Sequence, residues 1–393
     1  MFAQLGIYPS LMVFTEEMQQ RYARHLILPQ VGREGQERLQ RARVLCVGAG
    51  GLGSSCLVYL AAAGVGHLGI IDGDRVDLSN LQRQIIHGTP DVGRPKTESA
   101  RDTFLRINPL LSLDLHPYRL AADNALGLLR DYDIVVDGTD NFPARYLIND
   151  ACVLLKKPFV HGSIFQFEGQ ATLFDPGGGS PCYRCLYREP PPPEFAPSCA
   201  EAGVLGVLPG IIGCLQAAET LKWILRTGQS LAGRLLAFNA LELKFRELKL
   251  RRDPQCPVCG NHPTILQLKE YQPLCDMRNI PGRSGTHPDE VTVHDMRQAL
   301  EAGDPRIQVV DIREPAECQM VSISGVQNIP LSSLAERFGE LDPAKIIYLH
   351  CHSGGRSLRA VQFLKGKGYT QVKSVKGGIQ AWAEEIDPSL PKY

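Results

Sequence analysis

A glycine-rich run, residues 43–55, constrains the fold of this chain more than any other stretch. An apolar, β-branched segment enters a Gly-x-Gly-x-x-Gly turn at residues 48–53, and an apolar, alanine-rich helix over residues 56–63 leaves it. A turn of this kind points backbone N–H groups and a helix dipole at a phosphate group. Asp72 ends the next apolar strand, where a carboxylate accepts hydrogen bonds from ribose hydroxyls. The run therefore predicts a Rossmann-like nucleotide site.

The glycine pattern alone is also typical of nicotinamide-dependent dehydrogenases, so that class of enzyme stays as an alternative at this point. The residues after Asp72 favour a different nucleotide. Segments 74–84 and 93–96 bring Arg83 and Lys96, together with amides and hydroxyls, to the same cleft. A triphosphate that is attacked at its α-phosphorus needs such cations, whereas a dinucleotide does not.

Together with Gly138-Thr139-Asp140-Asn141, these residues resemble the ubiquitin-activating-like adenylyltransferases, which activate sulfur-carrier proteins for molybdopterin and thiamine synthesis. The resemblance spans residues 14–262 and implies an α/β, doubly wound domain that binds ATP with Mg²⁺. It implies nucleotide contacts from Gly51, Asp72, Ser79, Asn80, Leu81, Gln82, Arg83, Lys96, Asp140 and Asn141.

Alternating strands and helices over residues 43–140 predict a parallel sheet with helices on both faces. Asp140 follows the strand at 133–137 and precedes a helix. There its carboxylate can cap the helix, bind Mg²⁺ on ATP, or do both. His161, in a predicted strand, is interpreted as an interior histidine without a chemical role. Other expected elements are a helical region over 15–41, a helix at 96–107, strands at 158–163 and 169–174, a helix at 203–225, and a half-buried strand with a bulge at 241–250.

Arg21 and Arg24, three residues apart in the helical region, form one basic edge. Such an edge is often no more than a solvated face. In similar adenylyltransferases, however, the arginine that matches Arg24 reaches into the nucleotide site of the partner subunit. The resemblance therefore implies a homodimer in which Arg24 acts in trans.

Two Cys-x-x-Cys pairs, Cys182 with Cys185 and Cys256 with Cys259, suit a tetrahedral four-thiolate Zn²⁺ site. A redox-active dithiol is the alternative. The resemblance favours zinc. Because four thiolates leave no open coordination position, the metal would be structural.

Cys199 follows the proline-rich loop 189–198 and precedes the predicted helix at 203–225. A helix N-terminus lowers the pKa of a nearby thiol, which prepares a reactive thiolate. An incidental loop cysteine is the alternative. Relatives carry a cysteine here that can receive the activated carrier as a thioester or acyl disulfide, so Cys199 is a candidate catalytic residue.

A linker-like stretch, 263–285, separates the first domain from a smaller α/β domain at 286–393. In that second domain the strand at 346–350 ends at the loop Cys351-His352-Ser353-Gly354-Gly355-Arg356-Ser357, which opens a helix. Backbone N–H groups, the helix dipole and Arg356 would stabilise a thiolate or persulfide anion on Cys351.

The loop holds four residues between Cys351 and Arg356, whereas cysteine phosphatases hold five. The smaller ring suits a sulfane sulfur rather than a phosphate. With segments 311–315 and 375–382, the loop resembles rhodanese-type sulfurtransferases, although His352 and Gly355 differ from the usual loop residues. The resemblance implies persulfide chemistry on Cys351, with Arg356 as a catalytic partner.

Composition excludes some partners. The 42 basic and 42 acidic residues balance, so charge implies neither a nucleic acid nor a membrane surface. No apolar run is long enough to span a membrane, and the N-terminus lacks the basic start of a signal peptide. The 12 cysteines do not show the spacing of a secreted disulfide framework, so we expect a reducing cytoplasm.

Two functions follow from these features. The first is a fused enzyme that adenylates the C-terminal glycine of a small ubiquitin-like sulfur carrier ending in Gly-Gly. Cys351 then supplies sulfur, taken from an upstream persulfide or thiosulfate donor. The second is a carrier-binding adaptor with a degenerate activating fold. Degenerate copies usually lack site residues, whereas this chain keeps Arg83, Lys96, Asp140 and Cys351, which favours the enzyme. Carriers for molybdopterin, thiamine, cysteine or tRNA thiolation all fit.

Overall fold

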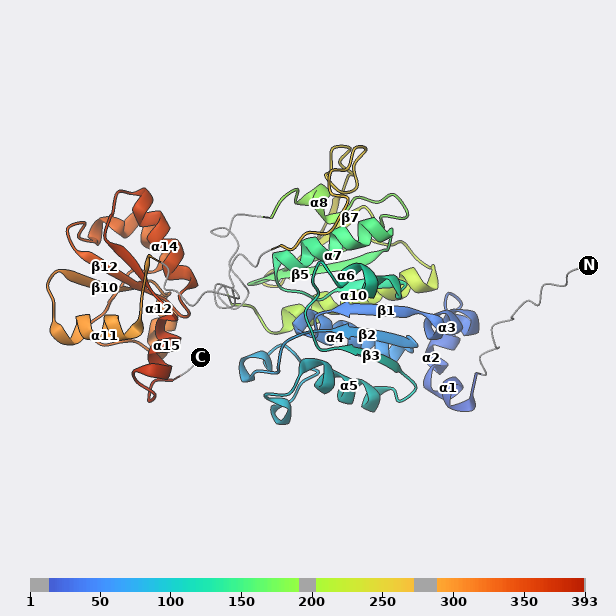
Figure 1. The fold of residues 1–393 in the computed structure, drawn as a ribbon. Coiled ribbons are helices and arrows are strands. Elements are labelled where there is room, and N and C mark those ends of the chain that lie inside the picture. The colour runs from blue at the N-terminus through green and yellow to red at the C-terminus, as the bar shows by residue number, and fades with distance from the viewer. Residues whose placement is uncertain (1–13, 191–202, 272–287, 392–393) are drawn as a thin grey trace, which may run out of the picture. The chain divides into compact units, whose positions relative to one another are not determined.

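A computed structural model describes residues 14–190, 203–271 and 288–391 (Figure 1). The chain divides into two compact units, Met1–Pro273 and Leu274–Tyr393. The two units are described separately below.

The first unit is built on an eight-stranded sheet in the order β3-β2-β1-β4-β5-β6-β7-β8. Its strands are β1 Arg43–Val47, β2 His67–Ile71, β3 Ser112–His116, β4 Ile134–Asp137, β5 Phe159–Phe165, β6 Glu168–Phe174, β7 Arg234–Asn239 and β8 Lys244–Lys249. Its helices are α1 Glu16–Arg21, α2 Ala23–Leu26, α3 Gly32–Arg41, α4 Gly51–Ala63, α5 Lys96–Ile107, α6 Ala125–Arg130, α7 Phe142–Leu155, α8 Tyr183–Leu186 and α10 Val207–Leu225, with 3₁₀ turns η1 Leu78–Asn80 and η2 Thr89–Asp91.

Strands β3, β2, β1, β4 and β5 are parallel, and β6 to β8 continue the sheet antiparallel. Buried residues of β1 alternate between two cores. Val44 and Cys46 pack with α4, α5 and α10, while Leu45 and Val47 pack with α6 and α7 on the other face (Figure 1). The predicted α/β, doubly wound architecture is confirmed. The strand order reverses between β1 and β4, which is where such sheets bind ligands.

The turns that follow β1 and β4 touch each other. Gly48 has a φ of +100°, and a Cβ atom placed on it would lie 2.8 Å from the carbonyl oxygen of Gly138. A Cβ atom on Gly53 would lie 2.0 Å from the carbonyl oxygen of Gly48. Only glycine fits these positions, because the backbone of the turn packs against α4 and against the turn after β4.

Three predicted elements differ in the structure. The helical region 15–41 is divided into α1, α2 and α3, with Pro29 between the last two. Helix α4 begins at Gly51 rather than at residue 56, so the glycine turn feeds straight into its first turn. Helix α10 begins at Val207 rather than at residue 203.

The fourth difference is at the sheet edge, where the predicted half-buried, bulged strand is wrong. Strand β8 pairs with β7 in an unbroken register, and every one of its residues is exposed. The leucines at 241 and 243 lie in the preceding turn. The alternating pattern predicted one buried face. Strand β8 has none, because it lies at the edge of the sheet and no further layer covers it.

The second unit is a five-stranded parallel sheet in the order β11-β10-β12-β13-β9, with helices packed on both faces. Its strands are β9 Glu290–Val291, β10 Ile307–Asp311, β11 Gln327–Asn328, β12 Ile346–His350 and β13 Val372–Val375. Its helices are α11 Val293–Ala302, α12 Pro315–Met320, α13 Leu334–Arg337, α14 Gly355–Gly366 and α15 Gly378–Glu385, with 3₁₀ turns η4 Leu331–Ser333 and η5 Phe338–Glu340.

The first unit extends further than the sequence suggests. Ile265 packs beside the four-cysteine cluster, and Tyr271 packs against the core under α7. The Tyr271 hydroxyl donates to Asp150 and accepts from the buried Arg184, each at 2.6 Å. Residues 263–271, expected in the linker, therefore belong with the first domain. These residues show no regular hydrophobic pattern, because only isolated side chains such as Ile265 and Tyr271 contact the domain.

Across the described parts of the chain, none of the helices combines the length and the apolarity needed to cross a membrane.

Candidate functional site

The predicted ribose ligand, Asp72, lies beside the glycine turn. Its carboxylate accepts hydrogen bonds from the backbone N–H groups of Ala49 and Asp74, both at 2.8 Å. Burial raises the pKa of Asp72, and the nearby Lys96 ammonium opposes that rise. Lys96 is itself buried at the start of α5, with Nζ 3.3 Å from a carboxylate oxygen of Asp74. The structure thus brings Asp72 and Lys96 to one edge of the sheet.

The polar loop after β2 also reaches the glycine turn. Within it, the side chain of Asp77 accepts from Ser79, and Asn80 caps the backbone of Asp77 in return. Arg83 donates to the carbonyl oxygen of Ser79 at 3.0 Å, and its Cγ lies 3.6 Å from where a Cβ of Gly51 would be. The side chain of Arg83 therefore passes next to the first turn of α4, the kind of position at which phosphates bind.

Leu81 and Gln82 continue this loop. Leu81 ends the 3₁₀ turn η1, and its backbone is held by the carbonyl oxygen of Leu78. A Cβ on Gly206 would lie 2.4 Å from Gln82 Oε1, so Gln82 packs against the residue before α10. The loop is thereby fixed between the glycine turn and the start of α10.

One of the roles predicted for Asp140, the N-terminal cap of the helix that follows it, is wrong. The cap of α7 is Asn141, whose side-chain oxygen accepts from the backbone N–H of Ala144 at 3.0 Å. Asp140 is exposed, and among the described residues its carboxylate has no hydrogen-bond or ion-pair partner. Because it follows the turn at Gly138, which touches the glycine turn, it is available to a ligand bound there.

The turn after β4 is held by two buried residues, Asp137 and His161, for which we predicted no role in the site. Asp137, at the end of β4, accepts from the backbone N–H and hydroxyl of Thr139 and pairs with His161 at 2.7 Å. Burial raises the pKa of Asp137, but these partners outweigh it and leave the pKa below its ordinary value. Burial lowers the pKa of His161. The prediction that His161 is an interior residue is confirmed. The sequence did contain a signal for this role of Asp137. The residue ends an apolar strand and stands two positions before a threonine whose hydroxyl it can bind.

Arg24 and Arg21 do not share one helix. Arg21 ends α1 and is engaged by Glu17 and by the carbonyl oxygen of Ile107. Arg24 lies on α2, is exposed, and has no side-chain partner among the residues that the structure describes. The predicted single basic edge is therefore divided: Arg21 is held by its own chain, whereas the side chain of Arg24 is exposed.

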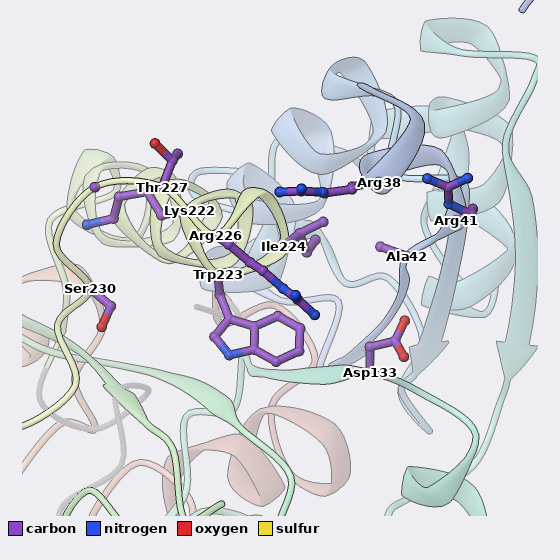
Figure 2. A pocket seen from close by; sticks show the side chains of 11 residues that line it. Arg38, Arg41, Ala42, Asp133, Lys222, Trp223, Ile224, Arg226, Thr227 and Ser230 are labelled. Carbon is purple, nitrogen blue, oxygen red and sulfur yellow. The ribbon is translucent and has the colours of Figure 1, made fainter. Parts of the chain in front are cut away.

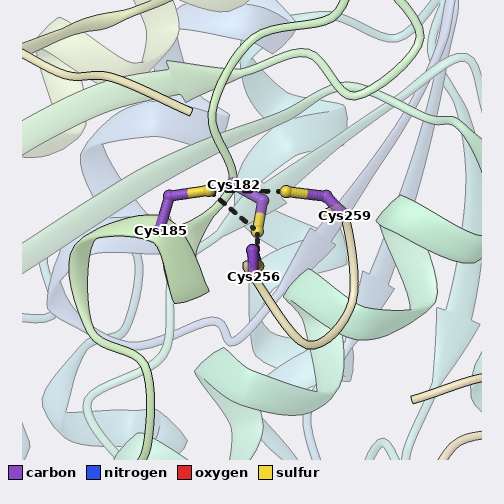
Figure 3. A group of neighbouring side chains, drawn as sticks. All are labelled: Cys182, Cys185, Cys256 and Cys259. Atoms are coloured by element: carbon purple, nitrogen blue, oxygen red, sulfur yellow. Dashed lines mark hydrogen bonds between the residues drawn. The ribbon is translucent and has the colours of Figure 1, made fainter. Parts of the chain in front are cut away.

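The four predicted metal ligands come together (Figure 3). The Sγ atoms of Cys182, Cys185, Cys256 and Cys259 all lie within 4.8 Å of one another. Individual Sγ–Sγ distances are 3.9 Å for Cys182–Cys185, 3.6 Å for Cys182–Cys256 and 3.4 Å for Cys185–Cys259. Tetrahedral Zn–S bonds of about 2.3 Å place sulfur atoms about 3.8 Å apart, so the cluster fits zinc.

Replacing Cys259 by alanine will remove zinc and lower the thermal midpoint by about 5–10 °C, because the knuckle at 256–259 loses its tie to 182–185. Metal analysis should find about one zinc per wild-type chain. Replacing Cys214 on α10, a free thiol outside the cluster, should leave the zinc content unchanged. Freshly purified wild-type protein without zinc would contradict the assignment.

The second unit forms a cradle around Cys351. The residue follows β12 directly and is 1% exposed, and its Sγ accepts hydrogen bonds from the N–H groups of Gly354 at 3.1 Å and Ser357 at 3.4 Å. The start of α15 packs against the Cys351 loop, and the backbone N–H of Ile379 donates to the carbonyl oxygen of Cys351. Gly378, at a φ of +57°, is so close that a Cβ would lie 2.2 Å from the carbonyl oxygen of Cys351. Two backbone donors at one sulfur suit an anion.

Arg356, which we expected to add positive potential at the Cys351 loop, is paired with a carboxylate. Its guanidinium forms two hydrogen bonds to the carboxylate of Glu317, on α12, each 2.6 Å long. This pairing could not be predicted from sequence patterns, because Glu317 and Arg356 are far apart in the chain. Strands β10 and β12 are neighbours in the sheet, so the loops that leave their carboxyl ends meet.

Cys199, a predicted catalytic residue, lies outside the described residues. Since α10 begins at Val207, the cysteine is further along the chain from the helix N-terminus than we expected.

A separate pocket of about 690 Å³ opens at the other end of the first sheet (Figure 2). Ala42 precedes β1 and Asp133 precedes β4, so the pocket lies at the amino ends of the parallel strands, away from the glycine turn. Arg38 and Lys222, which also line it, are engaged by carbonyl oxygens of Leu225 and Gln229. The pocket does not overlap the predicted nucleotide residues.

Two family models match the chain: the ThiF family over residues 22–258 and the Rhodanese-like domain over residues 292–385. The chain belongs to the ThiF family. The match covers the glycine turn, the polar loop, the first Cys-x-x-Cys pair and Cys256 of the second, and the other match covers the Cys351 loop. Both resemblances drawn from the motifs are thereby confirmed, and the nicotinamide dehydrogenase alternative is disfavoured.

Two relatives align with nearly all of this ThiF-family chain, and a third aligns with about two thirds of it. It is 45% identical to the probable adenylyltransferase/sulfurtransferase MoeZ of Mycobacterium tuberculosis, over 95% of each chain. It is 42% identical to the adenylyltransferase and sulfurtransferase MOCS3-2 of Zea mays, covering 100% of this chain and 83% of the relative. The sulfur carrier protein adenylyltransferase of Thermus thermophilus is 55% identical, and the match covers 68% of this chain and 100% of the relative.

Among solved structures, Escherichia coli MccB with AMPCPP and selenomethionine MccA is similar, with a TM-score of 0.54 and 25% identity over 63% of this chain and 75% of that one. The family and the relatives identify this ThiF-family chain as an adenylyltransferase and sulfurtransferase.

Proposed function

We propose that the chain adenylates the C-terminal glycine of a small ubiquitin-like sulfur-carrier protein ending in Gly-Gly, and then turns the adenylate into a thiocarboxylate. Two observations on one chain support the proposal. Asp140 is exposed beside the glycine turn and has no partner among the described residues, and Cys351 lies in a cradle of backbone donors. A degenerate adaptor would have no reason to keep either.

In the first step the carrier carboxylate attacks the α-phosphorus of ATP, and pyrophosphate leaves. Backbone N–H groups at the start of α4, with Arg83 and Lys96, would bind the phosphates, and Asp72 would accept from the ribose. Asp140 would hold Mg²⁺, which neutralises phosphate charge when bound. Asp137 would contribute indirectly, because it fixes the turn that carries Asp140.

In the second step the terminal sulfur of a Cys351 persulfide attacks the carbonyl carbon of the carrier adenylate. The bond from carbon to the AMP oxygen breaks, and AMP leaves with the electron pair. The product is an acyl disulfide. A thiol, either Cys199 or a small cellular thiol, then attacks the Cys351 sulfur and forms a disulfide with it, and the carrier leaves as a thiocarboxylate. A second thiol reduces that disulfide and returns Cys351 to its thiol form. Carrying both sites on one chain gives the persulfide a high effective concentration near the adenylate.

The remaining parts of the proposal concern assembly and metals. Arg24 would act in the nucleotide site of the partner in a homodimer. Its exposure supports this role, as does the absence of a side-chain partner among the described residues. The four-cysteine cluster would hold a structural Zn²⁺. All ten described cysteines are free thiols, which suits a reducing cytoplasm.

The proposal is tested by incubating the chain with ATP, Mg²⁺, a sulfane donor and each candidate carrier, and then weighing the carriers. We expect one carrier to gain the mass of an adenylate, and then that of a thiocarboxylate once a thiol is added. The same carrier shortened by its last glycine is the control and should stay unchanged. Carrier binding without either mass change would favour an adaptor.

A further inference from the structure

Arg356 is the single arginine of the Cys351 loop, residues 351–357, which contains no lysine. Its positive charge is balanced by Glu317, which lies outside the loop. The Nη1 and Nη2 atoms of Arg356 each donate to one carboxylate oxygen of Glu317 at 2.6 Å. The Arg356 side chain is 8% exposed and that of Glu317 is 18% exposed. A two-point contact between charged groups so poorly exposed to water is stronger than a typical surface ion pair.

Glu317 is itself held in place. It lies in the first turn of α12, and its Oε2 accepts a second hydrogen bond, from the backbone N–H of Glu314 at 3.0 Å. Pro315 fixes the start of that helix. Because β10 and β12 are hydrogen-bonded neighbours, with Asp311 paired to His350, α12 is kept close to the Cys351 loop. Glu317 therefore meets Arg356 without any rearrangement.

The charge balance bears on which donor can load Cys351. Thiosulfate is a dianion, so its approach to a Cys351 thiolate brings three negative charges together. An arginine with unbalanced charge would lower that cost, but the carboxylate of Glu317 offsets the charge of Arg356. A persulfide borne by a thiol carries at most one negative charge, so it meets less repulsion.

We propose that Glu317 is a specificity-determining residue of the sulfurtransferase site: by neutralising Arg356, it disfavours dianionic thiosulfate and favours a thiol-borne persulfide as the sulfur donor. The inference rests on the proposed function, since it concerns the step that loads Cys351. In that step the Cys351 thiolate attacks the outer sulfur of R–S–S⁻. The donor S–S bond breaks, R–S⁻ leaves with the electron pair, and Cys351 keeps the persulfide. No external oxidant or reductant is consumed.

The test compares two donors in the full-length protein. For Glu317→Gln, which keeps the acceptor for the Glu314 N–H but removes the charge, we expect kcat/KM for thiosulfate-to-cyanide transfer to rise about tenfold. That is the order expected for one charge-assisted hydrogen bond made available to the donor. The gain should fall mainly on KM and shrink with added salt. With cysteine persulfide as the donor, loading of Cys351 should change little.

Two further variants make the result specific. Glu314→Gln is the matched control, because Glu314 lies at the start of the same helix but its carboxylate binds Ser332 rather than Arg356. It should leave the thiosulfate rate as it is. Adding Arg356→Gln to Glu317→Gln should cancel the gain, since the freed arginine is what binds the dianion.

The proposal is overturned if folded Glu317→Gln shows an unchanged or lower kcat/KM with thiosulfate, because Glu317 would then only position Arg356. It is also overturned if the gain survives in the double variant. Neither result touches carrier adenylation or thiocarboxylate formation by the wild-type protein, which are measured separately. A failure of the donor inference is thus distinguishable from a failure of the proposed function.

Discussion

Replacing Cys351 by alanine will stop thiocarboxylate formation and thiosulfate-to-cyanide transfer completely, while carrier adenylation continues at the wild-type rate. The reason is that the only sulfur held by the Gly354 and Ser357 N–H groups disappears, whereas adenylation uses neither this thiol nor its loop. Mass spectrometry of the carrier, pyrophosphate exchange and a cyanide assay measure the three activities side by side.

Two other cysteines serve as controls for this result. Cys318→Ala, in the same domain, should keep sulfur transfer, because that thiol donates toward the Asp311 carboxylate and burial raises its pKa to about 11. Cys199→Ala should leave cyanide-dependent sulfur transfer untouched and reduce the thiocarboxylate yield in part or not at all. If the Cys351 variant still made thiocarboxylate from a sulfane donor without added sulfide, the second domain would have to be a binding module.

Replacing Asp140 by alanine should lower carrier-dependent pyrophosphate exchange by about a hundredfold or more, since the proposed site loses the carboxylate that holds Mg²⁺ on ATP. The fold should survive, because Asp140 is exposed and Asn141, not Asp140, caps α7. The matched control is Asp123→Ala, which should keep full exchange. Asp123 is another exposed aspartate of the same domain, and it has no side-chain partner in the described parts of the chain. Retained exchange in Asp140→Ala would remove this residue from the site.

The same variant also tests the trans role of Arg24. In a mixed dimer of Asp140→Ala and Arg24→Ala subunits, one nucleotide site would carry both defects and the other would carry none. Mixing the two inactive proteins in equal amounts should therefore restore exchange to about a quarter of the wild-type value if Arg24 serves its partner's site, because about half of the dimers are mixed and one of their two sites works. No recovery from dimers shown to be mixed would place Arg24 in its own subunit's site or outside catalysis.

The sequence by itself determined the parts of this protein that rest on local patterns. The glycine spacing at 48–53 predicted the turn, because a Cβ at Gly48 or Gly53 would collide with backbone, and strand–helix alternation predicted the parallel sheet. The two Cys-x-x-Cys pairs predicted a thiolate cluster that the fold does assemble. The spacing of residues predicts such features because each one is formed by neighbouring residues within a single turn, strand or Cys-x-x-Cys pair.

Only the tertiary structure decided which side chains have their charges balanced and which stay free. It paired Arg356 with Glu317 and buried Asp137 against His161, and it left Asp140 and Arg24 without partners among the described residues. It also exposed β8 on both faces, although its sequence alternates as a half-buried strand does. These outcomes depend on which strand ends become neighbours in the sheet and on what covers its edge. Neither is set by spacing along the chain, because ion pairing and burial require contacts between segments that are distant in sequence.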